Sequence, residues 1–350
     1  MVWLWYPAAP HPDAKPGAYL PGKWGEVLER DRGRYLWQHL DSVETHSVDD
    51  ALLSPAQPSY PVLIFSTGYG RVPTDYTVLA EDLTNHGYVV AAIAHTYSAP
   101  VVVFPDGRLV RRAAEAAIPE TSPAAGRIAS DRLVMLWAAD AIFVINQLER
   151  LNAAPAGRFS GRLDLTRLGL LGHSLGGATA AEVCSRDTRC QAGVDIDGWL
   201  FGDVVRVGIS SPFMFILSEP SVPPRIASAV LRQSVRESAQ AQVEAGREID
   251  SAYRHSSAGY EITLAGTRHF NFSDSALLFS PIMRATGMLG PIDGRRGLEI
   301  TCDYVRAFFD QYLNHQNSPL LTGPAPLYPE VGFQSHLASA TESPAQAVSR

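Results

Sequence analysis

The feature that most constrains the fold of this chain is a regular alternation of short apolar runs with longer amphipathic segments. Short, mainly apolar segments begin at residue 2 and recur at 61–66, 88–94, 167–171, 191–196, 212–217 and 260–265. Apolar residues at helical spacing fill intervening or following segments such as 75–86, 130–150 and 298–313. Short apolar runs are typical of strands that are buried on both faces, as in parallel sheets. The alternation therefore predicts an α/β fold with a mostly parallel central sheet and helices on both faces.

Length and composition exclude several classes of protein. The chain has 350 residues, of which 46% are hydrophobic and 19% charged, so a large core is feasible. The net charge of −7 and the lack of any basic block argue against a nucleic-acid partner. No apolar run approaches the roughly 18 residues that a membrane-spanning helix needs. The sequence does not fix the localisation. If a signal peptide precedes this chain in the natural protein, we expect the protein in the periplasm or outside the cell.

The segment pattern suggests how the chain is divided. We expect residues 1–315 to form a single domain and residues 316–350 to form an extended, partly disordered tail rich in Pro, Ser, Ala and Gln. Residues 221–257 interrupt the strand–helix rhythm with a polar segment that carries a narrow apolar stripe at helical spacing. This helical insertion is either a lid over a pocket or a surface helix packed on the body. The sequence leaves both interpretations open.

The chain has three cysteines, which cannot all pair within it. Cys184 and Cys190 are six residues apart, where a predicted helix end meets the next strand. That spacing is compatible with a disulfide that closes a small loop, and equally with two small buried thiols. Cys302 lies in the amphipathic segment 298–313, where we expect it in the core.

A Gly-x-Ser-x-Gly motif occurs once, at residues 172–176, and its central residue is Ser174. The motif joins an apolar strand to a helix rich in small residues. In that context a sharp turn lifts the serine side chain clear of the backbone, and the flanking glycines remove side chains that would collide. A serine that merely caps the helix is the alternative. We predict that Ser174 is a nucleophile.

A serine hydroxyl needs a neighbouring base and a carboxylate that orients the base. In hydrolases with this pattern the chain order is Ser, acid, His, and the histidine follows a late strand. His269 fits, because it comes directly after the predicted strand 260–265. The other histidines precede the serine, adjoin it, or lie in the insertion or near the last helix: His11, His39, His46, His86, His95, His173, His255, His315 and His336.

The acid has three candidates. Asp197 stands at the carboxyl end of the strand after the nucleophile helix, and Gly198 permits a tight turn there. Glu219 ends the following strand, a position that many hydrolases of this architecture use. Asp195 shares a strand face with Asp197 but lies inside the sheet. We rank Asp197 first, Glu219 second and Asp195 third.

An acyl-transfer enzyme also needs donors for the oxyanion that develops on the substrate. Backbone N–H groups of the residue after the nucleophile and of the loop after an early strand supply them in this architecture. These positions are Leu175 and Tyr69, and glycines on both sides of Tyr69 leave its backbone free to turn. A plain glycine turn with a surface tyrosine is the alternative.

Three segments together resemble the plasma-type (isoform II) platelet-activating factor acetylhydrolases and their bacterial relatives: residues 65–70, 172–177 and 195–201. The segment 266–274 is similar to the family's histidine loop, and 304–313 to its last helix. The resemblance covers about residues 1–315 and implies Asp197 as the acid, within an Asp-x-Trp-x-Phe segment. The family has His-Gly where this chain has Thr67-Gly68.

These observations predict a serine carboxylic ester hydrolase of the α/β-hydrolase fold that works through an acyl-enzyme. Ser174, His269 and Asp197 would form the triad, and Leu175 and Tyr69 the oxyanion hole. We expect no metal and no organic cofactor. The resemblance implies a short-acyl substrate such as an sn-2 acetyl or oxidised phospholipid, and hence a small-molecule or lipid ester as partner, with transient contact to a lipid surface.

Two further interpretations stay open. The same machinery would suit a dienelactone hydrolase or a cutinase-like polyesterase. A hydrolase fold that has lost activity and serves as a binding protein is a third interpretation, although candidates for the whole triad are retained. Trp199, Phe201 and Phe270 adjoin the triad positions and either line an apolar acyl pocket or belong to the ordinary core.

Overall fold

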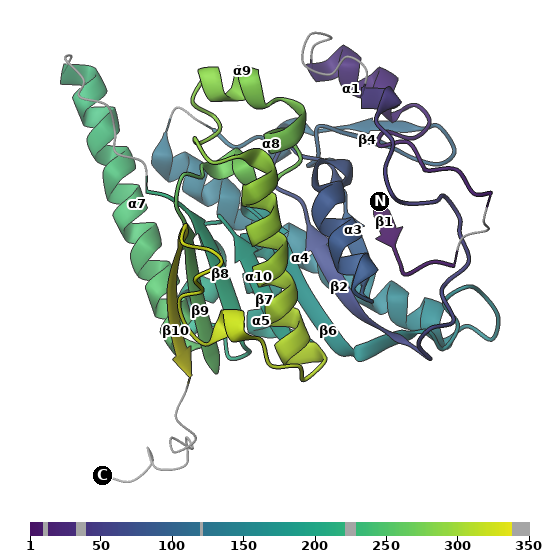
Figure 1. Ribbon diagram of the computed structural model, residues 1–350. Helices are drawn as coiled ribbons and strands as arrows, with labels where there is room; N and C mark the ends of the chain where they lie inside the picture. Colours follow the sequence, from purple (N-terminus) through teal and green to yellow (C-terminus); the bar gives the residue numbers. More distant parts are fainter. Residues whose placement is uncertain (10–12, 33–39, 120–121, 221–228, 338–350) are drawn as a thin grey trace.

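The computed structural model describes residues 1–9, 13–32, 40–119, 122–220 and 229–337 (Figure 1). Eight described strands form the main sheet in the order β1-β3-β2-β6-β7-β8-β9-β10. Their bounds are Val2–Trp5 (β1), Tyr60–Ser66 (β2), Val89–Ile93 (β3), Leu163–His173 (β6), Ala192–Ile196 (β7), Phe213–Ser218 (β8), Ala258–Leu264 (β9) and Val331–Leu337 (β10). All neighbours from β3 to β9 pair in parallel, whereas β1 and β10 pair antiparallel at the two edges. The predicted mostly parallel sheet is confirmed.

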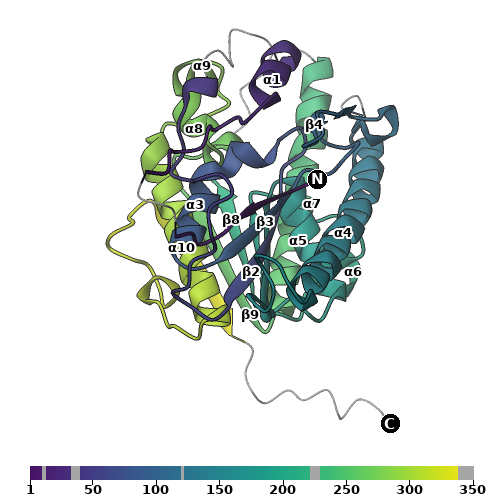
Figure 2. The same cartoon turned by 90° about the vertical axis from the view of Figure 1, so that its right-hand side faces the viewer.

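Helices cover both faces of this sheet, as Figure 2 shows. One face carries α3 (Thr77–Asn85) and α10 (Gly294–Leu313), and the other carries α4 (Pro123–Ala153), α5 (Leu175–Arg186) and α7 (Ala229–His255). Alternate residues of β2 supply the two cores: Leu63 and Phe65 pack toward α3 and α10, and Val62 and Ile64 toward α4 and α5. Burial on both faces explains why these strands are continuous apolar runs.

Shorter elements complete the described fold. They are α1 (Trp24–Arg32), α6 (Val204–Val207), α8 (Ser275–Leu278) and α9 (Ser280–Ala285), the hairpin β4–β5 (Val101–Val103 and Leu109–Arg111), and the 3₁₀ turns Leu40–Ser42, Pro73–Tyr76, Ala114–Ala116, His269–Phe272 and Pro319–Leu321. None of the described helices combines the length and the apolar character needed to cross a membrane.

The C-terminal boundary expected from the sequence is wrong. Within the expected tail 316–350, Val331–Leu337 forms β10 and pairs with β9 from Val331 opposite Leu264 to Leu337 opposite Ala258. β10 is an edge strand with mostly exposed or half-exposed residues, so its composition resembles that of a loop. Residues 338–350, where we expect disorder, lie outside the described residues.

The insertion 221–257 contains α7, which connects β8 to β9. Its C-terminal half packs on the sheet through Ile249 and Ala252, which are buried with the core beneath α4 and α5. Arg127 of α4 forms a two-pronged ion pair with Glu248, with both N–O distances 3.0 Å. This half is therefore a covering helix of the domain. Residues 221–228 lie outside the described residues, and a lid role stays a prediction.

Cys184 and Cys190 form a disulfide with a Cα–Cα distance of 5.1 Å. The bond joins the end of α5 to the turn before β7, and both cysteines are buried. Cys302 is a free, buried cysteine, as expected for a core residue of α10.

Candidate active site

Ser174 stands at a sharp turn between β6 and α5, with φ 58° and ψ −127°. A positive φ is uncommon for a residue with a side chain and marks a constrained position. The flanking glycines are required by close backbone approach. A Cβ on Gly172 would lie 2.3 Å from the carbonyl of Gly176, and a Cβ on Gly176 would lie 2.0 Å from the oxygen of Ser66. The Ser174 amide donates to the carbonyl of Ile196 at 2.8 Å, which fixes the turn against β7.

Asp197 and His269 meet above the carboxyl ends of β7 and β9. The His269 Nδ1 lies 2.7 Å from Asp197 Oδ2, and Asp197 Oδ1 accepts from the Ser218 amide at 2.7 Å. The His269 side chain is 40% exposed and that of Asp197 12%. Because a carboxylate accepts, His269 Nδ1 carries the hydrogen, and the neutral ring then has its lone pair on Nε2.

The environment of Asp197 keeps its carboxylate charged. Burial alone would raise the pKa of Asp197, but the hydrogen bond and charge of His269, with the Ser218 amide, outweigh burial and lower that pKa. A charged carboxylate at this position stabilises a positive charge on the neighbouring ring. The pair can therefore support an imidazole that accepts a proton.

The other two candidate acids bond elsewhere. Glu219 accepts from the Gly266 amide at 3.0 Å, which supports the turn before His269. Asp195 is completely buried, and its Oδ1 accepts from the Gly198 amide at 2.9 Å. Burial, together with the nearby Asp197, raises the pKa of Asp195 well above its usual value. Asp197 is thus the candidate that contacts His269.

The two candidate oxyanion donors lie in one apolar cluster, in which Tyr69 packs against Leu175 and its buried neighbours. Tyr69 follows β2, and its hydroxyl donates to the Ala116 carbonyl at 3.1 Å while accepting from Arg112 at 2.8 Å. Leu175 is the first residue of α5, so its N–H has no acceptor within the helix. These contacts hold the side chain of Tyr69. The backbone two residues before it lies close to the start of α5, since a Cβ on Gly176 would stand 2.6 Å from the Thr67 oxygen.

The three aromatic residues predicted near the triad have different surroundings. Phe201 packs against the cluster of Leu175 and Tyr69. Phe270 adjoins His269, with ring centroids 5.4 Å apart, and the Arg71 guanidinium lies 4.4 Å above its ring centroid. Trp199 is 42% exposed. An acyl-pocket role for all three stays a prediction.

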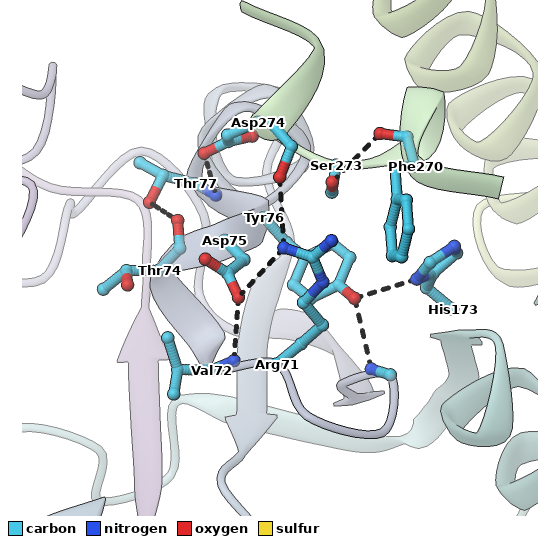
Figure 3. Close-up of polar contacts among 12 residues, drawn as sticks. Arg71, Val72, Thr74, Asp75, Tyr76, Thr77, His173, Phe270, Ser273 and Asp274 are labelled. Atoms are coloured by element: carbon cyan, nitrogen blue, oxygen red, sulfur yellow. Dashed lines mark hydrogen bonds and ion pairs between the residues drawn. The ribbon is translucent and has the colours of Figure 1, made fainter. Parts of the chain in front are cut away.

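Sequence reasoning missed the contacts that dock the His269 loop on the segment after β2 (Figure 3). The Asp274 carboxylate accepts from the Thr77 amide at 2.9 Å and so caps α3, while the Asp274 amide donates to the Asp75 carbonyl at 2.8 Å. Arg71 reaches across to the Ser275 hydroxyl at 3.1 Å. The sequence does show an acidic residue, Asp274, soon after His269. Its partner Thr77 is 197 residues away in the chain, so the sequence does not reveal the contact.

Asp274 should make the stability of the protein depend on pH. Burial, together with Asp75, raises the pKa of this carboxyl to about 7, although Tyr19 and the α3 amides favour its charged form. The unfolded carboxyl titrates near about 4. Between about pH 4 and about pH 7 the Asp274 carboxyl is therefore protonated in the folded chain and ionised in the unfolded chain. The free energy of unfolding falls across this range by about 1.4 kcal/mol per pH unit as pH rises.

We predict that Asp274→Asn removes this dependence, because asparagine keeps an acceptor for the Thr77 amide and does not ionise. Urea unfolding at pH 5 and pH 8 measures the effect. From pH 5 to pH 8 the free energy of unfolding of the wild type should fall by about 2 to 3 kcal/mol more than that of the variant. An equal pH response of both proteins would contradict the assignment.

No group of three or more His, Cys, Asp or Glu side chains in the described ranges is arranged to hold a metal ion. The candidate residues offer a serine hydroxyl, an imidazole with its carboxylate, and backbone amides. Such a set can carry out nucleophilic acyl transfer with general acid–base assistance.

Comparison with known proteins gives consistent matches. The model of the family described as platelet-activating factor acetylhydrolase, isoform II, matches residues 22–109 and 151–319. A probable 1-alkyl-2-acetylglycerophosphocholine esterase of Arthroderma benhamiae is 26% identical over 285 residues, which cover 78% of this chain and 66% of that protein. The platelet-activating factor acetylhydrolase of Cavia porcellus is 26% identical over 275 residues, which cover 73% of this chain and 58% of that protein. The chain thus spans less than two thirds of the length of these curated relatives.

A solved structure matches nearly the whole chain. The ferulic acid esterase from Streptomyces cinnamoneus aligns with a TM-score of 0.72 and 29% sequence identity, covering 95% of this chain and 88% of that chain. The alignment extends the similarity beyond the segments matched by the family model.

Proposed function

Because this chain belongs to the family of platelet-activating factor acetylhydrolases, isoform II, and has the α/β-hydrolase fold, we propose that it is a carboxylic ester hydrolase with a Ser174–His269–Asp197 triad. The observation that carries the proposal is the 2.7 Å contact between His269 Nδ1 and Asp197, on loops after β9 and β7. The positive φ of Ser174 at the turn before α5 supports a nucleophile at this position. The resemblance predicted from the sequence is confirmed at the level of the family.

In the proposed reaction, Ser174 Oγ attacks the ester carbonyl carbon while His269 Nε2 takes the hydroxyl proton. Asp197 stabilises the resulting imidazolium, and the N–H groups of Leu175 and Tyr69 bind the oxyanion of the tetrahedral intermediate. The intermediate collapses when its bond to the alkoxide breaks and His269 returns the proton to that leaving group. Water then attacks the acyl carbon while His269 takes its proton. The bond to Ser174 Oγ breaks as His269 returns that proton to the serine, and the carboxylic acid is released.

The names of the relatives indicate the substrate class for this proposal. The Arthroderma protein is described as an esterase of 1-alkyl-2-acetylglycerophosphocholine, which carries a short acetyl ester. We therefore propose short-acyl esters of glycerophospholipids as substrates. The ferulic acid esterase, at 29% identity over 95% of this chain, favours a second candidate, an ester of an aromatic acid.

Covalent labelling tests the mechanism. A fluorophosphonate should add one group to the folded protein, and peptide mapping should find it on Ser174. A folded chain that stays unlabelled would favour the inactive, ligand-binding interpretation over the enzyme.

A substrate panel separates the ester classes. It contains an sn-2 acetyl phospholipid, p-nitrophenyl esters of increasing acyl length, and methyl ferulate. Highest kcat/KM on the acetyl phospholipid supports the first candidate, and highest kcat/KM on methyl ferulate supports the second. A flat profile without phospholipid turnover would favour the polyesterase interpretation.

A further inference from the structure

Three hydrogen bonds run in series from the loop after β2 to the backbone of His269. Figure 3 shows the two that meet at the Tyr76 hydroxyl. The Gly68 amide lies 3.2 Å from the Tyr76 hydroxyl, and that hydroxyl lies 2.9 Å from His173 Nδ1. His173 Nε2 lies 2.9 Å from the carbonyl oxygen of His269. The series thus connects the segment before Tyr69, the residue beside Ser174, and the backbone of the candidate base.

Chemistry fixes the direction of each bond. A carbonyl oxygen only accepts, so His173 Nε2 must carry a hydrogen. Burial, together with the nearby His269, lowers the pKa of His173 well below its usual value, so the ring is neutral and Nδ1 has a lone pair. The Tyr76 hydroxyl therefore donates to Nδ1, and its oxygen accepts from the Gly68 amide.

Packing leaves these groups little freedom. Tyr76 and His173 are both buried, and the Tyr76 ring lies 4.8 Å from Phe65 and 5.7 Å from His173, measured between centroids. A Cβ on Gly68 would stand 3.1 Å from both the Tyr76 hydroxyl and His173 Nδ1. Glycine at position 68 thus lets the backbone approach the two side chains directly.

We propose that Tyr76 and His173 are positioning residues that set the Tyr69 amide and the His269 ring relative to Ser174. The inference rests on the proposed function, because it concerns the same triad and oxyanion hole. His173 is covalently next to Ser174, so one side chain links the nucleophile turn to both loops. Displacements of about 1 Å among reacting groups can cost about a hundredfold in rate.

Tyr76→Phe removes only the hydroxyl and keeps the ring. The variant leaves the Gly68 amide without its acceptor and His173 Nδ1 without its donor. We expect kcat for p-nitrophenyl acetate to fall about tenfold or more, with KM changed less than about twofold, because the substrate contacts are untouched. Tyr304→Phe is the matched control, since the buried Tyr304 hydroxyl has no hydrogen-bond partner among the described residues.

A spectroscopic readout separates positioning from general destabilisation. ¹⁵N NMR of histidine-labelled protein should show the Nε2–H form of His173 in the wild type and in Tyr304→Phe. In Tyr76→Phe the His269 carbonyl still selects the Nε2–H form, but Nδ1 loses its hydrogen-bond donor, so the ¹⁵N resonance of Nδ1 should shift while that of Nε2 stays. Thermal unfolding at the assay pH checks that each variant is folded at the assay temperature.

The outcomes are distinct. Equal kcat in the two tyrosine variants, or an Nδ1–H form of His173 in the wild type, would contradict the proposed positioning role of Tyr76 and His173. A tenfold fall confined to Tyr76→Phe, with the shifted Nδ1 resonance, would support that role. If the wild type neither hydrolyses esters nor reacts with the fluorophosphonate, the proposed function fails, while the tautomer measurement still reports on the hydrogen-bond series.

Discussion

Substituting Ser174 with alanine will lower kcat/KM for p-nitrophenyl acetate by about a thousandfold or more, and the fluorophosphonate will no longer label the protein. The size of the loss follows because no bond to the acyl group can form without the nucleophile, and triad members act as a unit. Residual rate should come only from the oxyanion donors and substrate binding. Steady-state kinetics with circular dichroism of the same samples measures both activity and folding.

Two companion variants sharpen this result. Ser174→Gly should be as inactive as the alanine variant but thermally more stable than it, because φ 58° is favourable for glycine and strained for alanine. Ser185→Ala, on the same helix α5, removes a hydroxyl that bonds only the Glu182 carbonyl in the described contacts and should stay active. Retention of a tenth or more of wild-type activity by Ser174→Ala would contradict the assignment.

Exchanging Asp197 for asparagine will reduce kcat by about a hundredfold to ten-thousandfold, whereas Glu219→Gln will change it less than about threefold. An amide in place of the Asp197 carboxylate stabilises the imidazolium poorly and can select the wrong tautomer of His269. Glutamine at 219 keeps an oxygen for the Gly266 amide, which is the contact that Glu219 makes. Single-turnover acylation rates of both variants provide the measurement.

The comparison of these two acids is decisive because they were alternatives in the sequence. His269→Ala should match Ser174→Ala in severity, since the ring is the proposed proton acceptor. A larger loss in Glu219→Gln than in Asp197→Asn would show that the carboxylate partner is wrong, even if the nucleophile is right.

The hydrophobic pattern of the sequence predicted the strands that are buried on both faces. Strands β2 and β3 are buried throughout, so each is an almost continuous apolar run. β10 was missed because an edge strand with one half-buried face and few long apolar residues resembles a loop. Its place beside β9 depends on pairing across the sheet, which composition does not encode.

The residues of the candidate site were predictable from the sequence, but some of the contacts that hold them were not. Chain order and the positions of strand ends were enough to select Ser174, His269 and the acids, because parallel strands place their carboxyl ends on one edge. The sequence favours Asp197 over Glu219, and Asp197 is the acid that contacts His269. The contacts of His173 and Tyr76 were not predictable, because Tyr76 looked like an ordinary helix residue and its partners lie far along the chain.

The position of β10 has a consequence for how the protein reaches its native state in the cell. Until residues 331–337 have left the ribosome, the outer backbone groups of β9 have no partner strand. Open sheet edges recruit strands from other molecules, so the nascent chain exposes a site for self-association in that interval. A chaperone that covers this edge, or slow translation that delays β10, would then change the yield of folded protein without any change in the candidate active site.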